Sequence, residues 1–200
     1  MQTNYNEILK QLDQIKPLEY ARNRNFIDGS VTRLSPYISR GVISTKQVLN
    51  HVLKKGFSPK KIEKFIQELA WRDYWQLIWL EKDINFYIKN PQSDVYQEGI
   101  SQCIVDAKTN IEAIDKSIED LYSTGYMHNH LRMYVASIST NIAKSQWKQP
   151  AKWMYYHLLD GDWASNALSW QWVCGANSNK KYIANQDNIN KYTYSNQKNT

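Results

Sequence analysis

The sequence is poor in cysteine and shows no sign of an export signal. Its two cysteines, Cys103 and Cys174, lie outside any spaced motif, in a chain of 200 residues. Two cysteines provide no disulfide framework and are typical of a reducing compartment. The start of the chain, residues 1–8, is polar and lacks the apolar core of a signal peptide. We therefore expect a cytoplasmic protein.

Long apolar runs, glycine-rich loops and strand patterns are also missing. No run of eighteen apolar residues occurs, so no membrane span is predicted. The seven glycines form neither a P-loop nor a dinucleotide fingerprint. A serine nucleophile elbow is absent, which argues against that class of hydrolase. Alternation of apolar and polar residues never persists. A bound nucleotide would therefore need helix ends and an all-α pocket.

Aromatic residues are plentiful, with eight Trp and fourteen Tyr. Large aromatic side chains build cores and also stacking surfaces for flat ligands. The net charge of +6 and the pI of about 9.1 give a mild basic bias, which is compatible with nucleic acid as a partner without requiring it. The length fits one domain, or one domain with a tail.

Helical spacing of apolar residues predicts an all-α domain of roughly eight helices. The expected helices cover residues 4–15, 35–40, 45–55, 59–80, 100–122, 126–144, 150–160 and the stretch after 162. Pro17 is expected to end the first helix, and Ser35 and Ser58, each followed by proline, to cap later ones. We predict a helical domain over 1–176 and an asparagine-rich tail over 177–200 that is ordered only if it docks.

Residues 157–172 concentrate polar and aromatic groups. Asp160 and Asp162 flank a glycine, which predicts a helix break and lets Asp162 cap the next helix. Asn166 and Trp170 follow at intervals of four and share a helix face with Asp162. Such a face suits a polar, planar ligand. The alternative is a capped core helix in which the indoles only fill space.

A second helix, over 59–80, has a tryptophan stripe. Trp71, Trp75 and Trp79 recur every four residues, and Glu68 and Arg72 form an i,i+4 pair beside them. A tryptophan row on a long helix is usually part of a core. A half-buried ion pair in the same turn, however, needs a reason, and this favours a ligand-lining role.

Anion and metal chemistry can be judged from two short segments. Thr32 and Ser35 place hydroxyls at a helix start beside Arg33, a pattern that suits phosphate but also fits an ordinary helix cap. His128 and His130 lie two residues apart without cysteine or carboxylate at zinc spacing, so we expect no metal site.

Arg132 requires a carboxylate partner if it is buried. Asp160 and Asp162 are both candidates for that partner, because a guanidinium and a carboxylate can form two parallel hydrogen bonds.

Four segments in this order resemble the helical FAD-binding domain of the photolyase/cryptochrome family. The matching segments are residues 20–37, 68–74, 125–133 and 159–172, and together they cover about residues 20 to 175. Any one of them is modestly specific, whereas four in register are very specific. The resemblance implies FAD as the cofactor.

The resemblance also implies which residues hold that cofactor. The phosphates and the adenosine half would contact Tyr20, Thr32, Arg33, Leu34 and Ser35. Glu68 and Arg72 would line the cavity. The isoalloxazine would be surrounded by Asn129, Arg132, Asp160, Asp162 and Asn166. Arg132 would pair with Asp160, and a cation beside the ring favours an anionic reduced flavin. Asn166 would face flavin N5, as in typical repair enzymes.

By the same resemblance, Trp71 and Trp172 match the two indoles of a DNA-lesion pocket, and Met133 matches its thioether wall. A lesion must leave the duplex to reach such a pocket, where aromatic walls stack on the extruded bases. Arg24 would contact phosphate at the rim. The implied reaction is light-driven repair of a cyclobutane pyrimidine dimer by an electron from reduced FAD.

The family also reduces its flavin through a tryptophan relay. Trp170 and Trp147 match the first two members by spacing. The third falls near Phe86 and Tyr87, of which Tyr87 is the candidate. The alternative is that both tryptophans are core residues.

Several departures from the family keep other functions open. No α/β antenna domain precedes the helical region, so no antenna chromophore is expected. His130 replaces an arginine common in repair enzymes, which weakens contact with DNA phosphate. Residues 180–186 replace the usual following segment. A light sensor, an electron-transfer flavoprotein and a remnant interaction module are therefore alternatives to a monomeric repair enzyme that binds damaged DNA.

Overall fold

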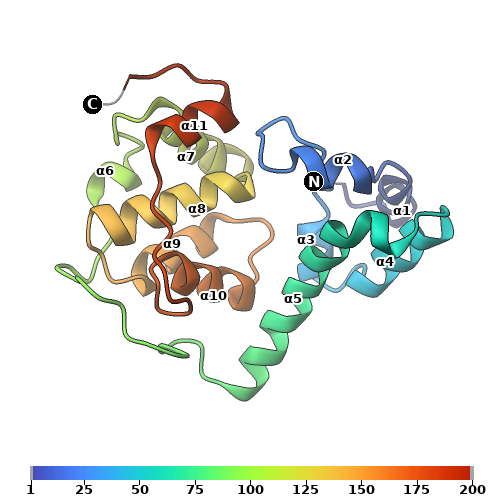
Figure 1. Ribbon diagram of the computed structural model, residues 1–200, viewed down its shortest axis with the longest axis horizontal. Helices are drawn as coiled ribbons and strands as arrows, with labels where there is room; N and C mark the ends of the chain where they lie inside the picture. Colours follow the sequence, from blue (N-terminus) through green and yellow to red (C-terminus); the bar gives the residue numbers. More distant parts are fainter. Residues whose placement is uncertain (1, 199–200) are drawn as a thin grey trace. The chain divides into compact units, whose positions relative to one another are not determined.

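The computed structural model describes residues 2–198, and these form two compact units, within Met1–Tyr74 and Trp75–Thr200 (Figure 1). The described residues are helical and contain no strand, only an isolated bridge between Gln97 and Ser145. The all-α prediction is confirmed. No helix in the described part of the chain is both long enough and apolar enough to cross a membrane.

The first unit packs short helices around an aliphatic core. Its elements are α1 (Tyr5–Asp13), α2 (Pro17–Asn23), α3 (Ser35–Ser39), α4 (Thr45–Lys54), the 3-10 turn η1 (Pro59–Ile62) and the first part of α5 (Glu63–Glu81). Ser44 and Gln47 form a reciprocal capping box at the start of α4. Leu34, Val52 and Phe65 are among the buried residues that hold these helices together.

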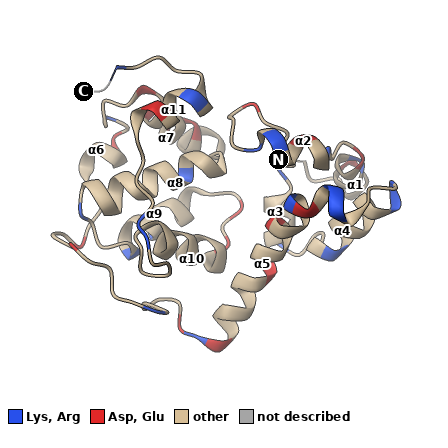
Figure 2. Cartoon of the chain, in the orientation of Figure 1, with Lys and Arg blue, Asp and Glu red and all other residues tan. Residues whose placement is uncertain are grey.

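The second unit has a larger core around three helices, α8, α9 and α10. Its elements are α6 (Gln102–Val105), α7 (Glu112–Thr124), α8 (Asn129–Ser137), the π-helical turn η2 (Ile138–Ile142), α9 (Lys148–His157), α10 (Trp163–Val173) and α11 (Gln186–Thr193). Helix α10 contacts both α8 and α9 and carries no charged residue (Figure 2). Tyr134, Trp147 and Trp170 are buried in this core.

Several helix boundaries differ from the sequence prediction. Pro17 begins α2 as well as ending the preceding turn, because the fixed φ of proline suits the first helical position. Ser35 already lies inside α3 and makes no capping hydrogen bond, and Ser58 makes none at η1. The expected helix over 100–122 is divided into α6 and α7, since Ala107 and Asn110 adopt positive φ.

The asparagine-rich tail docks on the second unit. Helix α11 is capped by Asn185 and packs on α7 (Figure 1). Gln197 accepts a hydrogen bond from the backbone N–H of Glu112 at 3.0 Å and donates to the carbonyl of Asn110. The sequence predicted that this tail is ordered only if it docks, and these contacts show that it does dock.

Candidate functional site

A bidentate ion pair lies at the centre of the second unit's polar site. Asp160 lies in the break between α9 and α10, and Arg132 lies on α8. The guanidinium donates from Nη1 to Oδ2 at 3.1 Å and from Nη2 to Oδ1 at 3.0 Å. The Asp160 side chain is 8% exposed, and Arg132 Nε also donates to the carbonyl of Met127. Asp160 is thus the carboxylate partner that a buried Arg132 requires.

Asp162 has a different task from Asp160. Its Oδ1 accepts from the backbone N–H of Ser165 at 3.0 Å, which confirms it as the N-cap of α10. The same oxygen accepts from Nε2 of Gln76 on α5 at 2.9 Å. The sequence analysis missed Gln76. It lies one turn after Arg72 on α5, so the i,i+4 rule could have identified it.

The side-chain amide of Asn166 is oriented by a backbone contact. Its Nδ2 donates to the carbonyl of Ala151 on α9 at 2.8 Å, and the side chain is half-buried. This bond leaves the second amide N–H and the side-chain oxygen for a ligand. Asn129 is exposed at the first turn of α8, one turn before Arg132. Carboxylate, guanidinium and amide together suit a heterocycle that has both N–H and C=O edges.

The first unit carries the hydroxyls and the cation predicted for phosphate. Thr32 Oγ1 accepts from the backbone N–H of Leu34 at 3.4 Å. Arg33 is exposed and adopts φ of 53°, an uncommon left-handed conformation for a residue with a side chain. Ser35 begins α3, while the side chain of Leu34 is buried in the core, so only the main chain of Leu34 is suited to a ligand.

Glu68 is the centre of a charged cluster in the same unit. It pairs with Lys64 one turn earlier at 2.9 Å and with Arg24 of the loop after α2 at 3.6 Å. Tyr20 packs edge-on against Phe65, with ring centroids 5.3 Å apart. Burial, and then the charge of Glu68, raise the pKa of Tyr20, so its phenol stays protonated. Arg72, one turn after Glu68, is half-buried.

The predicted aromatic residues separate into exposed and buried groups. Trp71 is 42% exposed and contacts Tyr74 edge-on, and Trp172 is 41% exposed. Met133 is half-buried against the second unit's core. Trp147 and Trp170, in contrast, are at most 2% exposed. The indoles assigned to lesion contact are thus accessible, and those assigned to the relay are enclosed.

One of the enclosed tryptophans has an aromatic neighbour, Trp163, to which the sequence assigned no role. Trp163 stacks on Trp147 with centroids 6.4 Å apart and an interplanar angle of 27°. Tyr87, the candidate third member of the relay, is half-buried, and its hydroxyl accepts from Gln146 at 3.4 Å. Trp163 is the first residue of α10 and lies 16 positions from Trp147, so local spacing gave no signal of this stacking.

His130 does not have the role expected of a surface residue facing DNA. It is 8% exposed and stacks on Tyr134 with centroids 4.6 Å apart. Its Nε2 lies 3.3 Å from the hydroxyl of Tyr182. Residue types alone predicted only a weakened phosphate contact at this position. Burial under the docked tail makes it part of the core instead.

Comparison with known proteins gives a family match for most of the second unit and part of α5. Residues 65–198 match the family described as the FAD binding domain of DNA photolyase. A deoxyribodipyrimidine photo-lyase of Alkalihalophilus pseudofirmus is 30% identical over 167 residues, covering 77% of this chain and 33% of the relative. The chain therefore spans about a third of the length of that relative.

Two solved structures have the same fold. A cryptochrome of Synechocystis superposes with a TM-score of 0.84 and 22% identity, over 96% of this chain and 44% of that chain. An archaeal photolyase of Sulfolobus tokodaii, described with two FAD molecules, superposes with a TM-score of 0.79 and 23% identity, over 96% and 44%.

The polar groups of the second unit fit FAD. The buried carboxylate of Asp160, its guanidinium partner Arg132 and the oriented amide of Asn166 supply acceptors and donors for a flavin edge. FAD is accordingly the cofactor that this domain type holds. A family match that covers two thirds of the sequence identifies the chain as a member of the photolyase/cryptochrome family, within its FAD-binding domain.

Proposed function

We propose that this chain works in light-driven DNA repair of the photolyase type, acting on cyclobutane pyrimidine dimers. The observation that carries the proposal is the exposure of Trp71 and Trp172, at 42% and 41%. Large indoles are normally at least partly enclosed, and exposed ones are suited to stack on flat partners. Bases extruded from a duplex provide such partners.

In this proposal, the family resemblance assigns a separate part of FAD to each group of residues. Tyr20, Thr32, Arg33, Leu34 and Ser35 contact the phosphates and the adenosine half, and Glu68 and Arg72 line the cavity. Asn129, Arg132, Asp160, Asp162 and Asn166 surround the isoalloxazine. When bound in its reduced state, FAD would supply, on illumination, the electron that opens the dimer, and the electron would return to it once the ring has opened.

The protein's own groups set the electrostatics and the geometry. Arg132 places a positive charge beside the flavin edge, and Asp160 fixes the direction of that guanidinium through two hydrogen bonds. The contact to the Ala151 carbonyl holds Asn166 in one rotamer, so that its amide faces a fixed point. Trp71, Met133 and Trp172 form the contacts to the lesion.

We also propose that Trp170 and Trp147 conduct electrons to the flavin, with Tyr87 toward the surface. Burial of both indoles favours this role over substrate contact, because enclosed rings cannot stack on DNA. Burial alone is equally compatible with packing, so the assignment rests on the family resemblance.

A repair assay tests the proposal directly. Reduced protein is mixed with an oligonucleotide that contains a pyrimidine dimer and is then illuminated, and recovery of thymine absorbance is followed. We expect recovery that requires light, and we expect Trp172→Ala to weaken lesion binding more than FAD binding. Trp79→Ala, which removes another exposed indole, provides the matched control and should leave both unchanged.

A light sensor or electron-transfer flavoprotein is the second candidate. The burial of His130, where repair enzymes commonly have an arginine, favours it because one phosphate contact is lost. Bound FAD without any light-dependent repair would support this candidate and contradict the first. A colourless protein that takes up no added FAD would contradict both flavin functions.

A further inference from the structure

The segment after α10 is anchored by three hydrogen bonds to the backbone of Tyr182. The Tyr182 N–H donates to the carbonyl of Val173 at 2.9 Å. Its carbonyl accepts from Ser137 Oγ at 2.7 Å and from Asn141 Nδ2 at 2.8 Å. Ser137 and Asn141 lie at the end of α8 and in η2, both buried. Both the backbone N–H and the backbone carbonyl of Tyr182 are therefore hydrogen-bonded to the core.

The ring of Tyr182 is fixed as firmly as its backbone. It stacks against Tyr134, with centroids 6.3 Å apart and an interplanar angle of 28°. Its hydroxyl lies 3.3 Å from His130 Nε2, and His130 itself stacks on Tyr134 at 4.6 Å. A third ring, Tyr192 of α11, packs on His130 at 4.6 Å. The docked tail thus encloses His130 and immobilises Tyr182.

The remaining neighbour of this ring is Trp172. The two centroids are 5.9 Å apart, and the planes are inclined by 32°. Trp172 projects from the last turn of α10 and is 41% exposed. An exposed side chain on a helix samples several rotamers unless a neighbour excludes them. Tyr182 is that neighbour, since it is itself held by contacts from α8 and η2.

We propose that Tyr182 is a positioning residue that holds the Trp172 indole in the orientation needed to stack on an extruded pyrimidine dimer. The proposal rests on the proposed repair function for its ligand. It joins two features of the sequence that departed from the family, because residues 180–186 supply the tyrosine and His130 binds its hydroxyl. In this proposal His130 does not contact DNA phosphate, and it supports the lesion-facing indole of Trp172 through Tyr182.

The test compares three variants of the full chain. Tyr182→Leu removes the ring, Tyr182→Phe keeps it and removes the hydroxyl, and Ile183→Ala is the matched control, an exposed neighbour in the same segment. We expect Tyr182→Leu to weaken binding of a dimer-containing oligonucleotide about threefold to tenfold, the range for one aromatic contact. Tyr182→Phe should stay within about threefold, and Ile183→Ala should bind like the parent.

A double-mutant cycle separates positioning from general damage. In a Trp172→Ala background, Tyr182→Leu should cost no further affinity, because its effect acts through the indole. An equal loss in both backgrounds, or no loss in either, would overturn the proposal. FAD affinity and binding of undamaged DNA should be unchanged in all variants, and a parallel loss of FAD affinity would indicate misfolding of the segment.

A spectroscopic measurement keeps the inference testable if the protein proves not to bind lesions. The near-ultraviolet circular dichroism assigned to Trp172, by subtraction of Trp172→Phe, reports the fixed environment of that indole without DNA. We expect Tyr182→Leu to abolish this signal and Tyr182→Phe to retain it. An unchanged signal in Tyr182→Leu would contradict positioning, whereas failure of lesion binding by the parent would contradict only the proposed function.

Discussion

Arg132 and Asp160, 28 residues apart in the chain, are joined by two parallel hydrogen bonds of 3.1 and 3.0 Å. The pair joins α8 to the break between α9 and α10, where several of the residues proposed to face the flavin are found. Because the Asp160 carboxylate is buried away from water, the Arg132 guanidinium compensates its charge. The same contact therefore supports the fold and sets the charge beside the proposed cofactor.

Removal of one partner from this pair should destabilise the domain strongly. Arg132→Met leaves the Asp160 carboxylate buried without its counter-charge, and we expect a loss of about 3 kcal/mol in the free energy of unfolding. Urea denaturation of the protein without FAD measures this loss. Arg132→Lys, which keeps the charge without the bidentate geometry, should lose less, and equal losses would show that charge contributes nothing.

Gly125 is required at the end of α7 for two reasons. Its φ is +69°, and a Cβ there would lie 2.5 Å from Cγ of Leu159. We expect Gly125→Ala to cost about 3 kcal/mol, from conformational strain and from the clash. Gly41→Ala has a similar φ of +70° and open space around it, so it should cost only about 1 kcal/mol.

Combining the change with Leu159→Ala isolates the clash. In that background, Gly125→Ala should cost no more than Gly41→Ala, as measured by urea denaturation. If the cost stays the same with and without Leu159, the close approach is not the cause.

Replacing the side-chain amide of Asn166 by a carboxylate should lower both the stability of the protein and its FAD binding. Asn166→Asp places a carboxylate against the Ala151 carbonyl, so the contact of 2.8 Å becomes repulsive. We expect a loss of about 2 kcal/mol in stability and loss of FAD binding. Thermal denaturation without FAD and absorbance titration with FAD measure the two effects. Asn129→Asp, at the exposed start of α8, should keep its stability, because a negative charge is favourable at a helix N-terminus.

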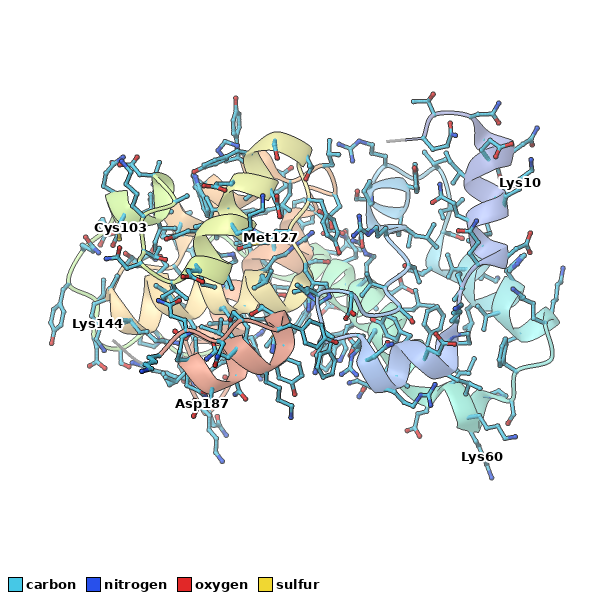
Figure 3. The ribbon with its side chains drawn as sticks, turned by 90° about the horizontal axis from the view of Figure 1, so that it is seen from above. Lys10, Lys60, Cys103, Met127, Lys144 and Asp187 are labelled. Atoms are coloured by element: carbon cyan, nitrogen blue, oxygen red, sulfur yellow. The ribbon has the colours of Figure 1, made fainter. Side chains whose placement is uncertain are left out.

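The two cysteines should differ in reactivity toward alkylating reagents. Cys103, labelled in Figure 3, is exposed on α6. Cys174, in contrast, is buried. Burial raises the pKa of the Cys174 thiol to about 11, so little thiolate forms at pH 8. Iodoacetamide should modify one cysteine in the folded protein and both in urea. Rapid labelling of Cys174 in the folded state would contradict the core packing of α10.

The same thiol should contribute a pH dependence to stability. In the unfolded chain the thiol loses its proton near pH 9, and in the folded chain at about pH 11. The contribution is therefore fully present below about pH 9 and is lost as the pH rises toward 11, by about 2–3 kcal/mol. Comparison with Cys174→Ala isolates it from the buried tyrosines. Parallel stability curves for the two proteins would exclude it.

Local patterns predicted much of the helical framework and of the candidate site. The spacing of apolar residues indicated an all-α domain, and the aspartate before Trp163 indicated the cap of α10, because both depend on neighbours within one or two turns. The requirement of Arg132 for a carboxylate also follows from its chemistry. The choice of Asp160 over Asp162 was left open by the sequence, since spacing does not distinguish two carboxylates that flank a glycine.

Long-range packing decided the remaining features. The stacking of Trp163 on Trp147 and the bond from Gln76 to Asp162 join residues 16 and 86 positions apart. The partners of His130 illustrate the same limit, because Tyr182 and Tyr192 reach it only after the tail docks. Residue types alone suggested a weakened phosphate contact at His130, whereas in the structure this side chain is buried under the tail.

The sequence by itself determined the helical class and the family, because periodicity and motif order are properties of the chain. It also set the types of groups at the proposed flavin-facing edge. Only the tertiary structure decided which indoles face solvent, which carboxylate holds Arg132 and what lies behind Trp172. Those outcomes depend on which helix faces are buried against one another, and burial is a property of the assembled core rather than of any local segment.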